Sequence, residues 1–163
     1  MAPFGTAIML VLGLSLTGCG KSNSTRLHNT FKSPDDLIQR VLVALEENDS
    51  AGLRAFCLSR FEHDSVLVPA MGKEHADLDL AWFYLETNID KGLSYAISTY
   101  GGRQLTLVRV EFREPVEKYR SLNLHRSPHV TVRDQVTGET LDLPIFGTVA
   151  EEQGQFKLVS IRD

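Results

Sequence analysis

Glu86 is the residue of this sequence best placed for acid–base chemistry. It lies four residues after Trp82 and three before Ile89, on the apolar side of a predicted helix. Burial in an apolar cavity raises the pKa of a carboxyl group, which can then act as a general acid or base near neutral pH. Trp82, Tyr95 and Phe112 would line such a pocket. In the alternative, Glu86 reaches solvent or pairs with a Lys or Arg, and the aromatic residues belong to the core.

Histidine and aspartate side chains are the candidates for a metal site. They fall on the end of one predicted helix and in the loop that follows it: His63, Asp64, His75, Asp77 and Asp79. A zinc site needs three or four ligands that converge in a fixed geometry, and nothing in this spacing brings them together. His125 and His129 flank a predicted turn, where surface polar residues are common. We therefore predict no metal and no cofactor.

The sequence contains none of the common catalytic motifs. It has no phosphate-binding loop, no dinucleotide-binding glycine pattern, no paired-cysteine zinc motif, no HExxH and no Gly-x-Ser-x-Gly elbow. The formal net charge is −4, whereas nucleic-acid binders usually carry a basic excess. These features favour a non-catalytic protein that does not bind nucleic acid.

A short apolar run lies near the N-terminus. Residues 7–16 are almost all apolar, and no charged side chain precedes Lys21. A bilayer-spanning helix needs about 20 apolar residues, so this run is too short to span well. Its length is typical of the apolar core of a secretory signal. Small residues, among them Thr17 and Gly18, then lead to Cys19, as a cleavage site requires.

The tetrad Leu16-Thr17-Gly18-Cys19 resembles the lipobox of bacterial lipoproteins. The resemblance implies that Cys19 takes a diacylglycerol in thioether linkage, becomes the new N-terminus and holds the protein on a membrane of the bacterial cell envelope. In enteric bacteria, an Asp directly after the lipidated cysteine marks retention in the inner membrane. The residue here is Gly20, which favours attachment to the outer membrane with the domain facing the periplasm. The segment before the apolar run lacks Lys and Arg, unlike a usual signal. The alternatives are an ordinary signal with a chance Cys, or a short membrane helix.

The other cysteine, Cys57, lies between Phe56 and Leu58 in an apolar helical pattern. This setting favours a small buried side chain over a reactive thiol. If Cys19 carries lipid, Cys57 has no partner for a disulfide within the chain.

Three parts follow from these features: a signal peptide over 1–18, the lipidated Cys and a flexible linker over 19–33, and one α+β domain over 34–163. Helices are predicted first, at 34–47, 51–58, 60–68 and from 77 or 79 to about 100. Alternating patterns then predict strands at 106–112, 118–125, 129–134, 139–152 and 155–162. The predicted architecture packs N-terminal helices on a curved antiparallel sheet of four to five strands.

Three features of the sequence indicate a family resemblance. They are the start of the first helix at Ser33-Pro34-Asp35-Asp36-Leu37, the break after that helix, and the long helix that ends in Tyr100-Gly101-Gly102. Together they resemble the nuclear transport factor 2-like (cystatin-like) superfamily. The resemblance implies a cone with a cavity between the sheet and the long helix, and it fixes no activity. We expect a lipid-anchored, non-catalytic module that holds a small apolar ligand or a protein partner. The alternative is an isomerase-like or dehydratase-like enzyme with Glu86 as its acid or base.

Overall fold

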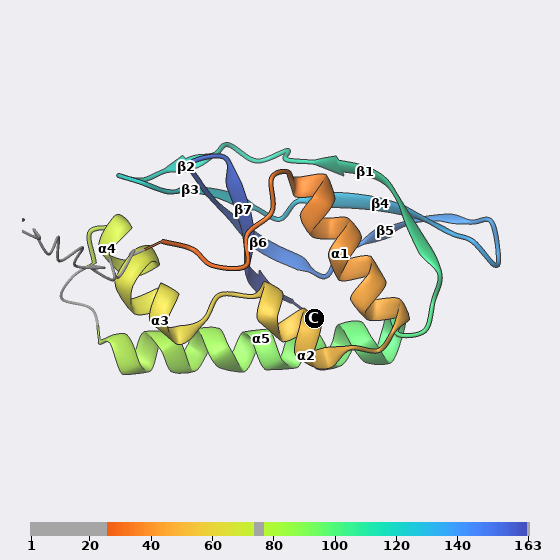
Figure 1. Cartoon of the computed structure of the whole chain (residues 1–163), viewed down its shortest axis with the longest axis horizontal. Helices are drawn as coiled ribbons and strands as arrows, with labels where there is room; N and C mark the ends of the chain where they lie inside the picture. Colours follow the sequence, from red (N-terminus) through yellow and green to blue (C-terminus); the bar gives the residue numbers. More distant parts are fainter. Residues whose placement is uncertain (1–25, 74–76, 163) are drawn as a thin grey trace, which may run out of the picture.

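The computed structural model describes residues 26–73 and 77–162. The predicted signal peptide, Cys19 and His75 lie outside the described residues. Helices come first and antiparallel strands follow, so the fold is α+β, as the sequence predicts (Figure 1). Within the described ranges, no helix has both the length and the apolar character needed to cross a bilayer.

The helices begin at capping residues that the sequence identifies. Their bounds are α1 (Pro34–Glu46), α2 (Ser50–Phe56), α3 (Arg60–Glu62), the π-helical turn η1 (His63–Leu67), α4 (Val68–Ala70) and α5 (Leu78–Tyr100). Ser33 accepts a hydrogen bond from the N–H of Asp36, and Ser59 and Glu62 form the predicted capping box. Asp77 caps α5. Each cap satisfies N–H groups that a helix start leaves unpaired.

Pro69 does not end the third helix, contrary to prediction. The helical segment that starts at Arg60 runs through Pro69 to Ala70. The π-helical turn shifts the hydrogen-bond register just before Pro69, which then occupies the first turn of α4. The missing N–H of proline breaks no helical bond in that position.

The strands form two antiparallel sheets rather than the single predicted sheet. The three-stranded sheet has the order β1-β4-β5, and the four-stranded sheet has the order β2-β3-β6-β7. The bounds are β1 (Leu105–Glu111), β2 (Glu117–Lys118), β3 (Asn123–Arg126), β4 (His129–Asp134), β5 (Thr140–Leu143), β6 (Phe146–Glu152) and β7 (Gln155–Ile161). The predicted strand 139–152 divides at Pro144, because proline cannot donate a ladder hydrogen bond.

A β-bulge in β1 changes which of its side chains face the core. The register with β4 shifts between Leu107 and Arg109, and Val108 is exposed. Leu107 and Val110 pack against the core instead. Simple alternation along the predicted strand 106–112 would put Val108 and Val110 on the same face. One extra residue at a bulge reverses the faces, so that part of the prediction is wrong.

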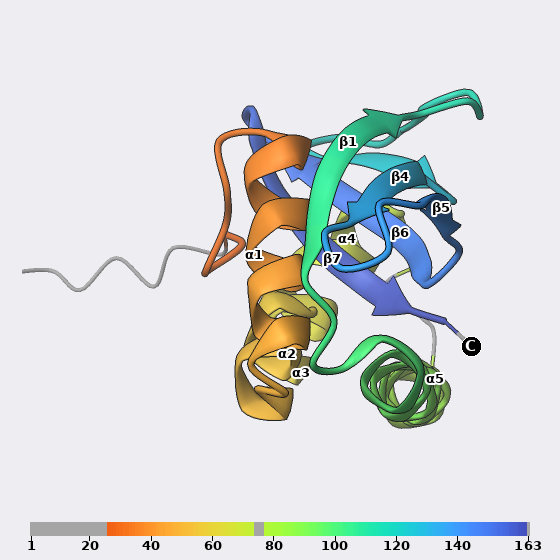
Figure 2. The same cartoon turned by 90° about the vertical axis from the view of Figure 1, so that its right-hand side faces the viewer.

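The main core lies among α1, α5 and both sheets. Figure 2 looks nearly along α5 and shows α1 against β1. The predicted core face of α5 is confirmed at Trp82, Ile89, Leu93, Ala96 and Tyr100, which are buried. A second apolar cluster joins the α3–α4 segment to β3, β6 and β7. Strand β7 is therefore covered on both faces.

Candidate functional site

Glu86 lies at the surface beside a cation. Its carboxylate is 3.9 Å from the guanidinium of Arg54, and its side chain is 46% exposed. The same guanidinium lies over the ring of the buried Trp82, 5.8 Å from the ring centroid. Glu86 is therefore solvated and ion-paired at the surface, and it is not enclosed in an apolar cavity.

The other predicted pocket residues lie elsewhere. The ring of Tyr95, at the far end of α5, contacts that of Tyr100 with centroids 6.4 Å apart. Phe112, just after β1, stacks on His125 with centroids 4.2 Å apart. The structure therefore places Trp82 and Glu86 together, and Tyr95 and Phe112 in two other places.

We expect Glu86→Gln to change the free energy of unfolding by less than about 0.5 kcal/mol, because exposed ion pairs contribute little. Urea unfolding followed by Trp82 fluorescence would measure it. A loss above about 2 kcal/mol would contradict an exposed setting and point to a buried partner for the carboxylate.

The predicted metal candidates take part in hydrogen bonds and ion pairs. His63 is buried, its Nδ1 lies 2.7 Å from the Asp64 carboxylate, and its ring contacts Trp82. Arg60 hydrogen-bonds to both Asp64 and Asp79. No group of three His, Cys, Asp or Glu side chains that could hold a metal ion occurs in the described residues.

Cys57 is buried, as predicted, and its thiol donates a weak hydrogen bond to the carbonyl of Leu53. Burial raises the pKa of the Cys57 thiol to about 12, despite the nearby charges of Arg54 and Lys157. Since the thiolate is the reactive form, this cysteine is inert in the folded protein.

A buried ion pair fastens the N-terminal segment to the fold. Glu62 and Lys157 are 1% and 2% exposed, and the Lys157 ammonium lies 3.2 Å from the Glu62 carboxylate. Lys157 also donates to the carbonyl of His28 at 2.6 Å, and the N–H of His28 donates to Glu62 at 2.6 Å. Ser59 donates to Glu62 through its N–H and its hydroxyl. Both buried charges are thus compensated within the protein.

Two more contacts hold the same segment. The N–H of Leu27 donates to the Glu152 carboxylate at 2.9 Å, and Phe31 exchanges two backbone hydrogen bonds with Phe156 of β7. Leu27 and Phe31 are therefore bonded to the folded domain, although both lie within the predicted linker. Sequence reasoning missed this site because Glu62 also serves as a capping residue, and because Glu62 and Lys157 lie far apart in the chain, one on a helix and the other on a strand.

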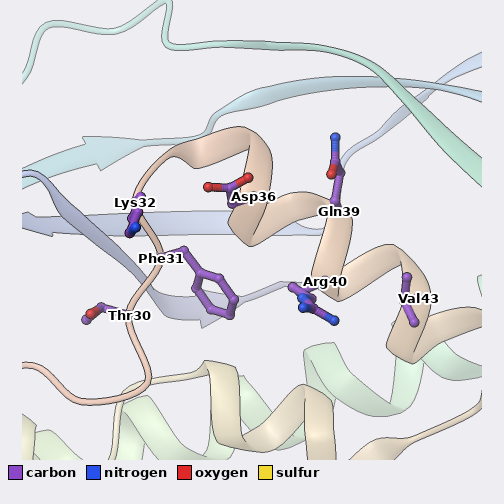
Figure 3. Close-up of a pocket in the computed structure, with 7 residues that line it drawn as sticks. All are labelled: Thr30, Phe31, Lys32, Asp36, Gln39, Arg40 and Val43. Carbon is purple, nitrogen blue, oxygen red and sulfur yellow. The ribbon is translucent and has the colours of Figure 1, made fainter.

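A hollow of about 480 Å³ lies between this segment and α1. Its lining residues are Thr30, Phe31, Lys32, Asp36, Gln39, Arg40 and Val43, drawn in Figure 3. The Phe31 ring packs edge-on against Phe56, with centroids 5.5 Å apart. Neither Lys32 nor Arg40 has an ion-pair partner in the described part of the chain. The hollow thus offers an aromatic surface and two free cations.

A second hollow, of about 420 Å³, lies between α5 and the ends of β3, β6 and β7. Arg126 and Arg162 are among its lining residues. Arg126 pairs with Glu117, and Arg162 donates to the Pro144 carbonyl and the Ser127 hydroxyl. Its cationic groups are therefore already engaged.

Comparison with protein-family models, curated proteins and solved structures finds no match to this chain.

Proposed function

We propose that this protein is a lipid-anchored domain of the bacterial cell envelope, attached to the membrane through Cys19. The single observation that carries the proposal is the apolar run 7–16 followed by Leu16-Thr17-Gly18-Cys19. Gly20 after the cysteine favours the outer membrane, with the domain facing the periplasm. One lipid chain anchors only marginally, whereas two or more hold stably.

The domain serves as a non-catalytic module that holds a protein partner or a small apolar ligand, and it does not bind nucleic acid. The hollow beside α1 supports this role, because it is lined by the Phe31 ring and by Lys32 and Arg40, two cations without an ion-pair partner among the described residues. The exposed position of Glu86 beside Arg54 gives no support to the enzymatic alternative.

For the fold, we propose a relationship to the nuclear transport factor 2-like superfamily. The element order supports it, since helices precede an antiparallel arrangement and α5 packs on β7. The division of the strands into two sheets departs from a single curved sheet.

Cys19→Ser tests the anchor. We expect the wild-type protein to fractionate with membranes, to lack residues 1–18 and to carry the added mass of acyl chains in intact-protein mass spectrometry. The variant should lack that mass and move to the soluble fraction. Cys57→Ser is the matched control and should keep the lipid. A Cys19→Ser protein that still floats with membranes at unchanged mass would refute the proposal.

A further inference from the structure

The outward face of α5 is apolar at the start of the helix. Leu80, Phe83 and Tyr84 share one stripe, because residues three and four apart lie on the same side of a helix. They are 49%, 60% and 60% exposed, on the side opposite the buried Trp82 and Ile89. The rings of Phe83 and Tyr84 contact each other, with centroids 5.8 Å apart.

A fourth exposed apolar side chain lies where the N-terminal segment meets the fold. Phe61 of α3 is 54% exposed, and its ring centroid lies 6.5 Å from that of His28. Arg60, the neighbour of Phe61, joins α3 to the start of α5 through its hydrogen bond with Asp79. We call the exposed side chains of Phe61, Leu80, Phe83 and Tyr84 the α3–α5 surface.

The length of the preceding chain limits where a bilayer can lie. Leu27, whose N–H is hydrogen-bonded to Glu152, is eight residues from Cys19. An extended chain spans at most about 3.6 Å per residue, so these two residues are no more than about 29 Å apart. The segment at Leu27, α3 and the start of α5 lie at one end of the molecule, and the β4–β5 turn lies at the other (Figure 1). An anchor at Cys19 would therefore lie within reach of the α3–α5 end.

We propose that the α3–α5 surface rests on the lipid bilayer, with Phe61, Leu80, Phe83 and Tyr84 in the interfacial region. The inference depends on the proposed acylation of Cys19. Aromatic side chains favour the boundary between headgroups and acyl chains. An apolar helix face at this boundary adds to the attachment that a covalent lipid supplies.

A second copy of the chain fits this surface less well than a bilayer does. A stable protein interface extends over about 20–30 residues a side around an apolar centre, whereas the large exposed apolar side chains of α5 end at Tyr84, apart from Tyr95, which is 37% exposed. Farther along α5, the same face carries Lys91, Ser94 and Ser98, which are exposed and polar. The apolar part of this face is thus confined to the α3–α5 end, which is the end within reach of Cys19.

The test places an environment-sensitive thiol label at position 83 by Phe83→Cys in the full chain. Acylated protein is purified from membranes and reconstituted in phosphatidylethanolamine and phosphatidylglycerol vesicles. Cys57 is buried and inert, so it leaves the new thiol as the reactive one once Cys19 is acylated. Tyr84→Cys is a second labelled variant in case the first does not fold. Val136→Cys is the control, since Val136 is 80% exposed in the β4–β5 turn.

We expect the label at position 83 or 84 to shift its emission to shorter wavelength and to be quenched by brominated lipid, while the label at 136 does neither. Labels at 83 and 84 that remain in water on acylated, floating protein would overturn the inference and leave the anchor intact. Self-quenching between copies without lipid quenching would overturn it in favour of a dimer. Protein without acyl chains would overturn both the anchor and this inference.

Discussion

Glu62→Gln is expected to lower the free energy of unfolding by about 3–5 kcal/mol, which is the usual cost of removing one partner of a buried ion pair. The substitution leaves the Lys157 ammonium, 2% exposed, without its counter-charge. It also removes an acceptor for the N–H groups of His28 or Ser59, since an amide nitrogen cannot accept them. Thermal and urea unfolding of the purified protein would measure the loss.

Two further variants separate the buried charge from general damage. Glu62→Gln combined with Lys157→Met should lose less stability than Glu62→Gln alone, because no buried charge is then left unpaired. Glu111→Gln is a matched surface control: Glu111 pairs with Arg109 and Arg113 at the surface, so its loss should cost less than about 1 kcal/mol. Equal losses for the Glu62 and Glu111 variants would contradict the role of the buried pair.

The same pair predicts a pH dependence. Burial raises the pKa of Glu62, but hydrogen bonds from Ser59 and His28 and the charge of Lys157 together hold it below its ordinary value of 4.5. The unfolded carboxyl therefore takes up a proton first as the pH falls. The stabilisation is present above about pH 4.5 and is lost below it as the pH falls through the folded pKa. Stability of the wild type should fall more steeply in this range than that of Glu62→Gln.

Gly92→Ala is expected to destabilise the protein by about 1–3 kcal/mol, although alanine is the better helix former. A Cβ at this position of α5 would lie 2.4 Å from the carbonyl oxygen of Ile161 and 2.8 Å from the backbone nitrogen of Arg162. These are backbone atoms at the end of β7, so they cannot rotate away as the end of a side chain can. The helix and the strand must separate, and the packing between them is lost.

Ser94→Ala is the control for Gly92→Ala, because Ser94 lies on the exposed face of the same helix. It should leave stability unchanged or raise it by a few tenths of a kcal/mol. Both variants are compared by urea unfolding. A Gly92→Ala protein as stable as Ser94→Ala would mean that α5 does not approach β7 this closely.

The α5 helix illustrates how far local patterns reach. Its length and its buried face follow from spacing along the chain, and the structure confirms them and selects Asp77 over Asp79 as the cap. The ion pair of Glu86 depends on tertiary structure, because α2 brings Arg54 beside it. Spacing alone left two alternatives for Glu86 because a residue at the edge of an apolar stripe can face either core or solvent.

In the strands, contacts between distant segments matter more than the local sequence pattern. The alternation in 106–112 predicts β1, yet the bulge at Val108 depends on pairing with β4. Lys157 alternates with the apolar Phe156 and Leu158, and this local pattern does not identify a partner for its charge. That side is buried because the α3–α4 segment packs over it, and Glu62 supplies the counter-charge.

By itself, the sequence determined the helix starts and the α+β order, since each depends on residues within a few positions of one another. It also supplies the Cys19 prediction, which rests on a linear pattern. Only the tertiary structure decided the two sheets, the Glu62–Lys157 pair, the fastening of Leu27 and the close contact at Gly92. Those features join residues far apart in the chain, and packing rather than local conformational preference selects their partners.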